Sequence, residues 1–188
     1  MKLSLIAVLF ALTSSFQVPD INFTPESEKF SKAVREYQTI WIKEGKRMIE
    51  AMEIVSRLKF KEKNITAIVY EGVSWSGSGS SPMKLRASYP SDVKKATLIH
   101  ELGHRLISDV TKTKEIDEHR ALFLILYDIW VKLYGKDFAD KSVDVEKKRK
   151  GLYDYESAWS WALSFSEKER ALKFRQLVSS SRIRSPAG

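Results

Sequence analysis

Apolar residues recur every three or four positions between Pro25 and Leu58, with lysine, arginine and glutamate between them. On a helix this spacing gathers the apolar side chains on one face, so we predict an amphipathic helix over 25–58. Gly45 lies inside the segment and either divides it into two helices or weakens a single one. The first patterned part of the chain is therefore predicted to be helical.

Two short segments that follow have the patterns of strands. Ile65–Tyr70 is rich in β-branched residues, and Met83–Tyr89 alternates apolar with polar positions. The segment Ser76–Pro82 between them consists of serine, glycine and proline and reads as a flexible turn. We therefore predict a short antiparallel sheet made of these two strands.

Beyond Pro90 the pattern becomes helical again. Ser91 is suited to cap a helix that begins at Asp92 and runs to about Ser108. Apolar residues surround the axis of this helix, which is typical of a buried helix. Further helices are predicted for the apolar stretch 121–133, ended by Gly135, and for 143–150, 155–165 and 166–178, the last opening with the capping-box pair Ser166 and Glu169. The predicted fold class is α+β and mostly helical.

The chain has 188 residues, enough for one sizeable core and too few for two comfortable domains. Its start, Lys2 followed by the apolar run Leu3–Leu12, has the pattern of an export signal. We expect residues 1–15 to form a signal peptide and residues 16–188 to form a single domain. No other segment is long and apolar enough to cross a bilayer. The protein is therefore expected to be a monomer that is secreted or periplasmic.

Composition narrows the possible partners. The sequence contains no cysteine, so a zinc site would use ligands from histidine, aspartate and glutamate. The formal net charge is +8 at pH 7, but no basic run alternates with aromatic residues as a stacking platform for nucleic acid does. We expect no nucleic-acid partner. A solvated basic face accounts for the charge, and it would also favour acidic substrates or an anionic cell envelope.

The candidate chemistry is concentrated in the segment 97–104, which contains the pattern His-Glu-x-x-His. On a helix His100 and His104 lie on the same face, so both imidazoles can bind one metal ion. Glu101 lies about a third of a turn away, where it can accept a proton from a metal-bound water. The third histidine of the chain, His119, is close by in the sequence. The pattern predicts a zinc-dependent hydrolase with one Zn²⁺ ion.

The ion needs a third protein ligand, and the residues leave three alternatives. In the metzincin pattern this ligand follows the second histidine by six positions, where the chain has Val110, and a glycine is required where it has Ile107. Asp109 comes one position too early, so it is the weakest alternative. Glu118 and His119 in the next predicted helix are the other two. Neighbours on a helix are about 100° apart, so normally only one of them can face the ion.

Glu118, followed three residues later by Ala121, resembles the glutamate helix of the gluzincins, in particular their small members, the minigluzincins. The resemblance covers about 65–134. It implies a zincin-like fold, in which a short sheet packs on the active helix and the next helix supplies Glu118 to the zinc. One position departs from the larger gluzincins, because their acidic residue four positions after the glutamate is Leu122 here. Asp117 or a backbone carbonyl would then have to orient a ligand imidazole.

The same resemblance implies a secreted metallopeptidase in which a zinc-bound water attacks the peptide bond with Glu101 as general base. A peptide or protein substrate would pair with the strand 83–89. Tyr153 or Tyr155 would stabilise the oxyanion. The alternative is a catalytically inactive secreted zinc-binding interaction module of the same fold, although such a module needs no general base. A helical interaction protein without a metal is a third hypothesis, which the clustered histidines disfavour.

Overall fold

The computed structural model describes residues 17–111, 116–149, 151 and 153–184. The predicted signal peptide, 1–15, lies outside these residues. In the described part of the chain, no helix is long and apolar enough to cross a membrane. The elements, in chain order, are β1 (Asp20–Pro25), the 3-10 helix η1 (Glu28–Phe30), α1 (Ser31–Ser56), β2 (Asn64–Tyr70), β3 (Met83–Arg86), α2 (Ser91–Thr111), α3 (Glu118–Tyr134), α4 (Lys136–Lys147), α5 (Tyr155–Leu163) and α6 (Glu167–Arg184).

The three strands form one sheet in the order β1-β2-β3, and all of them are parallel. Ala67 of β2 lies opposite Met83 of β3, and Tyr70 lies opposite Arg86, with both strands running the same way. The antiparallel pairing predicted for these strands is therefore wrong. The coarser prediction of a mostly helical α+β fold is confirmed, while the zincin-like fold stays a prediction.

The path of residues 71–82 explains the parallel pairing. After β2 this segment runs back along the outer edge of β3, where Trp75 pairs antiparallel with Lys84. The N–H and C=O groups of Lys84 both bond to Trp75, and the N–H of Arg86 donates to Ser74 Oγ at 3.1 Å. The chain can therefore enter β3 from the same end as β2. The edge that was predicted to pair with a substrate peptide is already occupied by residues 74 and 75.

The sequence pattern does not predict β1. Only Ile21 and Phe23 carry its alternation of buried and exposed positions, which is too little for a strand signal. β1 pairs in parallel with β2, with Ile21 opposite Ile65, and α1 forms the crossover that such a connection requires. The helix predicted over 25–58 consequently begins later, at Ser31.

α1 continues without a break through Gly45. A Cβ atom at this position would lie 2.7 Å from Cδ2 of Trp41, so the missing side chain leaves room for the indole ring against the helix. Of the two alternatives left open by the sequence, one helix is therefore the observed outcome.

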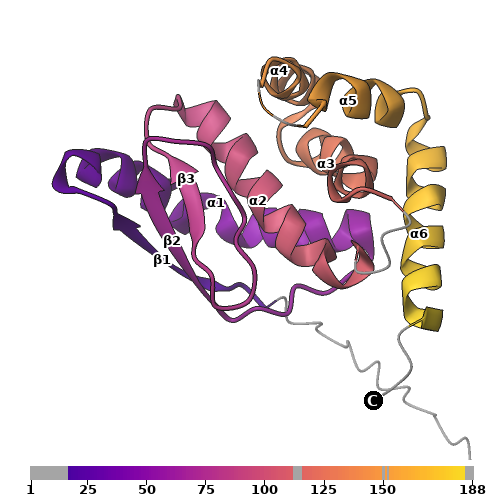
Figure 1. Ribbon diagram of the computed structural model, residues 1–188, viewed down its shortest axis with the longest axis horizontal. Helices are drawn as coiled ribbons and strands as arrows, with labels where there is room; N and C mark the ends of the chain where they lie inside the picture. The colour runs from indigo at the N-terminus through magenta and orange to yellow at the C-terminus, as the bar shows by residue number, and fades with distance from the viewer. Residues whose placement is uncertain (1–16, 112–115, 150, 152, 185–188) are drawn as a thin grey trace, which may run out of the picture.

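α2 lies at the centre of the fold, with the sheet on one side and the C-terminal helices on the other (Figure 1). It contacts β3 and α1, and it also contacts α3, α4 and α6. Every residue from Ala96 to Ile107 is buried, as its apolar pattern predicts. The polar side chains of this helix therefore need partners from the elements packed around it.

Two helix ends predicted from capping residues are confirmed. Gly135 follows α3 with a φ of 85°, a left-handed conformation that glycine adopts without strain. At the start of α6 the N–H and the hydroxyl of Ser166 donate to Glu169 Oε2 at 2.8 and 2.7 Å, which is part of the predicted capping box. The residues that give these signals are close together in the sequence, so the sequence alone predicts such helix ends reliably.

Candidate metal centre

The close packing of α2 on α3 brings the three histidines together. Gly103 faces α3, and a Cβ atom at this position would lie 2.6 Å from Cδ1 of Leu122. Ala121 of α3 is fully buried. These two small residues let the helices approach closely, so that His119 in the first turn of α3 meets the histidines of α2.

His100, His104 and His119 each offer a ring nitrogen to one small volume, and these three atoms lie within 4.8 Å of one another. The Nε2 atoms of His100 and His104 are 3.0 Å apart. His100 and His104 are almost fully buried, at 1% and 7% exposure. The structure thus brings His100 and His104 together with His119. The third ligand that the resemblance implies was its neighbour Glu118.

Glu118 lies beside His104 and outside this group of three. Its Oε1 atom is 2.9 Å from His104 Nδ1, but within the described residues that nitrogen has no aligned hydrogen bond. The close contact with His104 lowers the pKa of Glu118. Asp109, the weakest of the predicted ligands, pairs instead with Lys61 at 2.8 Å. Neither carboxylate belongs to the group of candidate ligands.

A carboxylate from α4 orients His100. Glu146 Oε1 is 2.7 Å from His100 Nδ1, and the indole N–H of Trp159 donates to Oε2 at 2.9 Å. Burial alone would raise the pKa of Glu146, but the nearby His100 and Arg149 and two hydrogen bonds lower it to about 2. Glu146 is therefore an ionised acceptor that fixes the direction in which His100 presents its other nitrogen.

The sequence analysis missed Glu146, because nothing local marks a glutamate on a different helix as a partner of His100. Its own suggestion, Asp117, has a different role. The side chain of Asp117 caps α3 by accepting the N–H of Arg120 at 2.9 Å, and it also accepts the hydroxyl of Tyr153. Asp117 therefore fixes the start of the helix that carries His119.

His119 is packed between the two tyrosines predicted to act on the substrate. Its ring stacks on Tyr153 with centroids 4.2 Å apart, and its Nε2 atom is 3.1 Å from the hydroxyl of Tyr155. Burial lowers the pKa of His119 to about 3, and the neighbouring His100 and His104 act in the same direction. The imidazole is therefore neutral at pH 7, the form that binds metal ions.

Glu101 is buried, at 3% exposure, and within the described part of the chain its carboxylate makes no hydrogen bond or ion pair. Burial raises the pKa values of Tyr37 and Tyr155, and the nearby Glu101 adds a smaller effect in the same direction. A buried carboxylate without a bonded partner is unusual in a folded protein.

Arg149, just after α4, is a second residue that the sequence analysis missed. Its guanidinium lies 3.4 Å from Glu146 Oε1 and 5.5 Å from the ring centre of Tyr155. Burial opposes its charge, whereas Glu146 and Glu101 raise the pKa of Arg149. Its Nε atom is buried and has no hydrogen-bond partner among the described residues. Among the described residues, one buried donor of this partly buried cation is therefore left unused.

The residues present fit a zinc ion. Two nitrogens that share a tetrahedral zinc stand about 3.4 Å apart, close to the 3.0 Å between the Nε2 atoms of His100 and His104. A nitrogen of His119 that lies at the outer limit of 4.8 Å would have to approach by about 1.4 Å. All three donors are imidazole nitrogens, which suit zinc among the common divalent ions.

Comparison of the chain with protein-family models, curated proteins and solved structures gives no match. Its function therefore has to be inferred from the chemistry of the site itself.

Proposed function

We propose that this protein is a secreted zinc-dependent metallopeptidase that hydrolyses peptide bonds. The observation that carries the proposal is the group of three histidines next to an unbonded buried glutamate on the same helix. Three nitrogen ligands with no thiolate are typical of catalytic zinc sites rather than structural ones. The export signal predicted in the sequence accounts for the proposed secretion.

In this proposal His100, His104 and His119 hold the ion, so His119 replaces Glu118 as the preferred third ligand. Glu146 and Glu118 then orient His100 and His104 from behind, through their Nδ1 atoms. A zinc ion held in this way lowers the pKa of a bound water toward neutrality and polarises a substrate carbonyl.

Glu101 is the proposed general base. Its carboxylate accepts a proton from the attacking water, whose oxygen joins the carbonyl carbon of the scissile bond. As the C–N bond breaks, Glu101 returns the proton to the amine nitrogen. The burial of Glu101 and the absence of a bonded partner among the described residues support this role.

Two side chains close to the candidate ligand His119 and to Glu146 are suited to the negative charge that develops on the carbonyl oxygen. The hydroxyl of Tyr155 lies at His119 Nε2, and the unused Nε donor of Arg149 lies in the same surroundings. Preorganised donors of this kind are a main source of rate enhancement. Tyr153 serves less directly, because its hydroxyl is bonded to Asp117.

The experiment that tests the proposal compares the wild-type protein with Glu101→Gln, using a mixed peptide library and elemental analysis. We expect near-stoichiometric zinc in both proteins and peptide cleavage only by the wild type. Glu50→Gln on the surface of α1 serves as the control, and it should keep both zinc and activity.

The alternative function, an inactive zinc-binding interaction module, has one structural observation in its favour. The outer edge of β3, where a substrate peptide was predicted to pair, is covered by Trp75. Zinc in both proteins with no cleavage by either would support this alternative. If the wild type binds no zinc even after zinc is added back, both proposals fail.

A further inference from the structure

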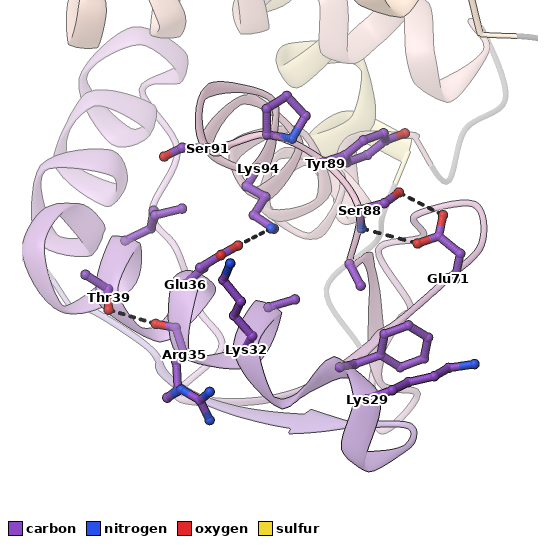
Figure 2. Close-up of a pocket in the computed structure, with 15 residues that line it drawn as sticks. Lys29, Lys32, Arg35, Glu36, Thr39, Glu71, Ser88, Tyr89, Ser91 and Lys94 are labelled. Carbon is purple, nitrogen blue, oxygen red and sulfur yellow. Dashed lines mark hydrogen bonds and ion pairs between the residues drawn. The ribbon is translucent and has the colours of Figure 1, made fainter.

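A second possible binding site lies at the other end of α2. A cavity of about 830 Å³, widely open to solvent, is lined by the first half of α1, the turn that follows β3 and the start of α2, as Figure 2 shows. Its volume falls within the range of ligand sites in proteins, roughly 300–1,000 Å³. None of its lining residues belongs to the candidate metal centre.

The lining of this cavity includes two ammonium groups close to one carboxylate, namely the buried Lys94, the exposed Lys32 and Glu36. Lys94 of α2 is 3% exposed and forms an ion pair with Glu36 of α1. Lys32 points toward the same carboxylate (Figure 2), and it contributes to the lowered pKa of Glu36 after the larger effect of Lys94. The exposed Lys32 and the buried Lys94 therefore share the single carboxylate of Glu36.

The other charged lining residues do not supply the missing negative charge. Glu71 is already bonded to the N–H and hydroxyl of Ser88 and paired with Arg86 at 3.1 Å. Lys29 and Arg35 lie at the rim and add positive charge. The cavity is therefore suited to accept an anionic group. A bound carboxylate, together with Glu36, would balance the positive charges of Lys32 and Lys94.

The cavity and the candidate metal centre lie at different positions along α2. Tyr89 lines the cavity, on the turn that leads from β3 into α2. Along α2, Ser91 and His100 are about 14 Å apart at 1.5 Å per residue. An extended peptide covers this distance with about four residues.

We propose that this cavity binds an acidic side chain of the polypeptide substrate, about four residues from the bond that is cleaved. The inference rests on the proposed peptidase function and adds to it the class of substrate, namely polypeptides with glutamate or aspartate at that distance. An acidic peptide is favoured over a larger polyanion because one further carboxylate is enough to balance Lys32 and Lys94.

Binding can be measured without catalysis, using the Glu101→Gln protein and fluorescence anisotropy. The probes are a fluorescein-labelled, amidated peptide with two glutamates and the same peptide with two glutamines. We expect the glutamate peptide to bind about tenfold more tightly, an ordinary effect for a partly shielded charge. It should bind equally well to protein with and without zinc.

The decisive comparison is Lys32→Glu with Lys43→Glu. Both residues are exposed on α1 and both substitutions change the net charge equally, but only Lys32 lines the cavity. Lys32→Glu should weaken binding of the glutamate peptide about tenfold, and Lys43→Glu should leave it within about twofold. Equal losses in the two variants, or equal binding of the two peptides, would overturn the proposal.

Two further outcomes separate this inference from the proposed function. If the wild-type protein cleaves no peptide but binding of the glutamate peptide still depends on Lys32, the cavity remains an acidic-peptide site and the peptidase function is rejected. Cleavage that shows no preference for glutamate near the scissile bond rejects the cavity proposal alone. Tighter Lys32-dependent binding of a single-stranded oligonucleotide or an anionic vesicle would assign a different partner and also overturn it.

Discussion

The two ends of α2 both contain a buried charged group, and they differ in what surrounds it. At the candidate metal centre, Glu146 has both carboxylate oxygens bonded, to His100 and Trp159, and is 2% exposed. At the cavity, Lys94 is equally buried, but its partner Glu36 is 44% exposed and borders an open space.

This difference separates a positioning role from a binding role. A fully bonded, buried ion holds its neighbour in one orientation, and its removal leaves an uncompensated charge. An ion at the edge of a cavity can exchange its partner for water or for a ligand, so that its removal has a smaller effect on the fold. The predictions that follow test this contrast.

The largest effect is expected for His119, the proposed third zinc ligand. His119→Ala should reduce zinc affinity by more than the 10–100-fold that is typical when a residue that only orients a ligand is removed. The reason is that His119 is proposed to bind the ion directly. Glu118→Ala should retain zinc. Elemental analysis and competition with a chelator measure both. Loss of zinc chiefly in Glu118→Ala would restore the ligand set that the gluzincin resemblance implies.

The two orienting carboxylates should differ from each other. Glu146→Gln is expected to weaken zinc binding by about 100-fold and Glu118→Gln by no more than about 10-fold, since only Glu146 is fully buried with aligned hydrogen bonds. Isothermal titration with zinc on metal-free protein gives both values. If both variants lose the same zinc affinity, burial of the carboxylate does not decide how strongly it supports zinc binding.

The sequence predicts those features that depend on residues near one another. The spacing of His100 and His104 places them on one buried helix, and Gly135 and Ser166 mark helix boundaries correctly. In each case the interaction spans at most four residues, so helix geometry alone connects pattern to structure.

Features that depend on distant residues could not be predicted. Glu146 meets His100 only because α4 packs on α2, and no local pattern records that contact. The parallel sheet depends on the path of residues 71–82, which the sequence presents only as a flexible turn. Likewise, the choice between Glu118 and His119 depends on how α3 rotates against α2, which neighbouring positions in the sequence do not determine.

The segment that covers β3 offers a matched pair of glycines. Gly77 has a φ of 63°, and a Cβ atom there would lie 2.5 Å from the carbonyl oxygen of Ser81, whereas Gly79, with a φ of 55°, faces open space. Arg105 holds this segment through the carbonyls of Ser76 and Ser81 at 2.7 and 2.9 Å, so the backbone cannot shift freely.

Gly77→Ala should therefore destabilise the protein by about 2 kcal/mol, from left-handed strain plus a backbone clash. Gly79→Ala should lose about 1 kcal/mol, from the strain alone. Urea unfolding followed by tryptophan fluorescence measures both free energies. If Gly79→Ala is as unstable as Gly77→Ala, the clash of the added Cβ atom with the backbone that Arg105 holds contributes nothing.

The smallest effect is expected for Glu36→Gln, at the open end of α2. The hydrogen bond from Lys94 lowers the pKa of Glu36 below its usual 4.5. A lowered pKa means that the ionised carboxylate stabilises the fold, fully above pH 4.5, and that this contribution is lost as the pH falls through the lowered value. Because Glu36 is partly exposed and water can reach Lys94 from the cavity, the contribution should stay below about 1 kcal/mol.

Urea unfolding of the wild type and Glu36→Gln at pH 7 and pH 3 measures this contribution. We expect the wild type to be the more stable protein at pH 7 and the difference to shrink at pH 3, where protonation begins to remove the same ion pair. A difference that is equal at both pH values would mean that Glu36 acts through packing. The lining of the cavity would then not depend on charge, and the contrast between the two ends of α2 would be lost.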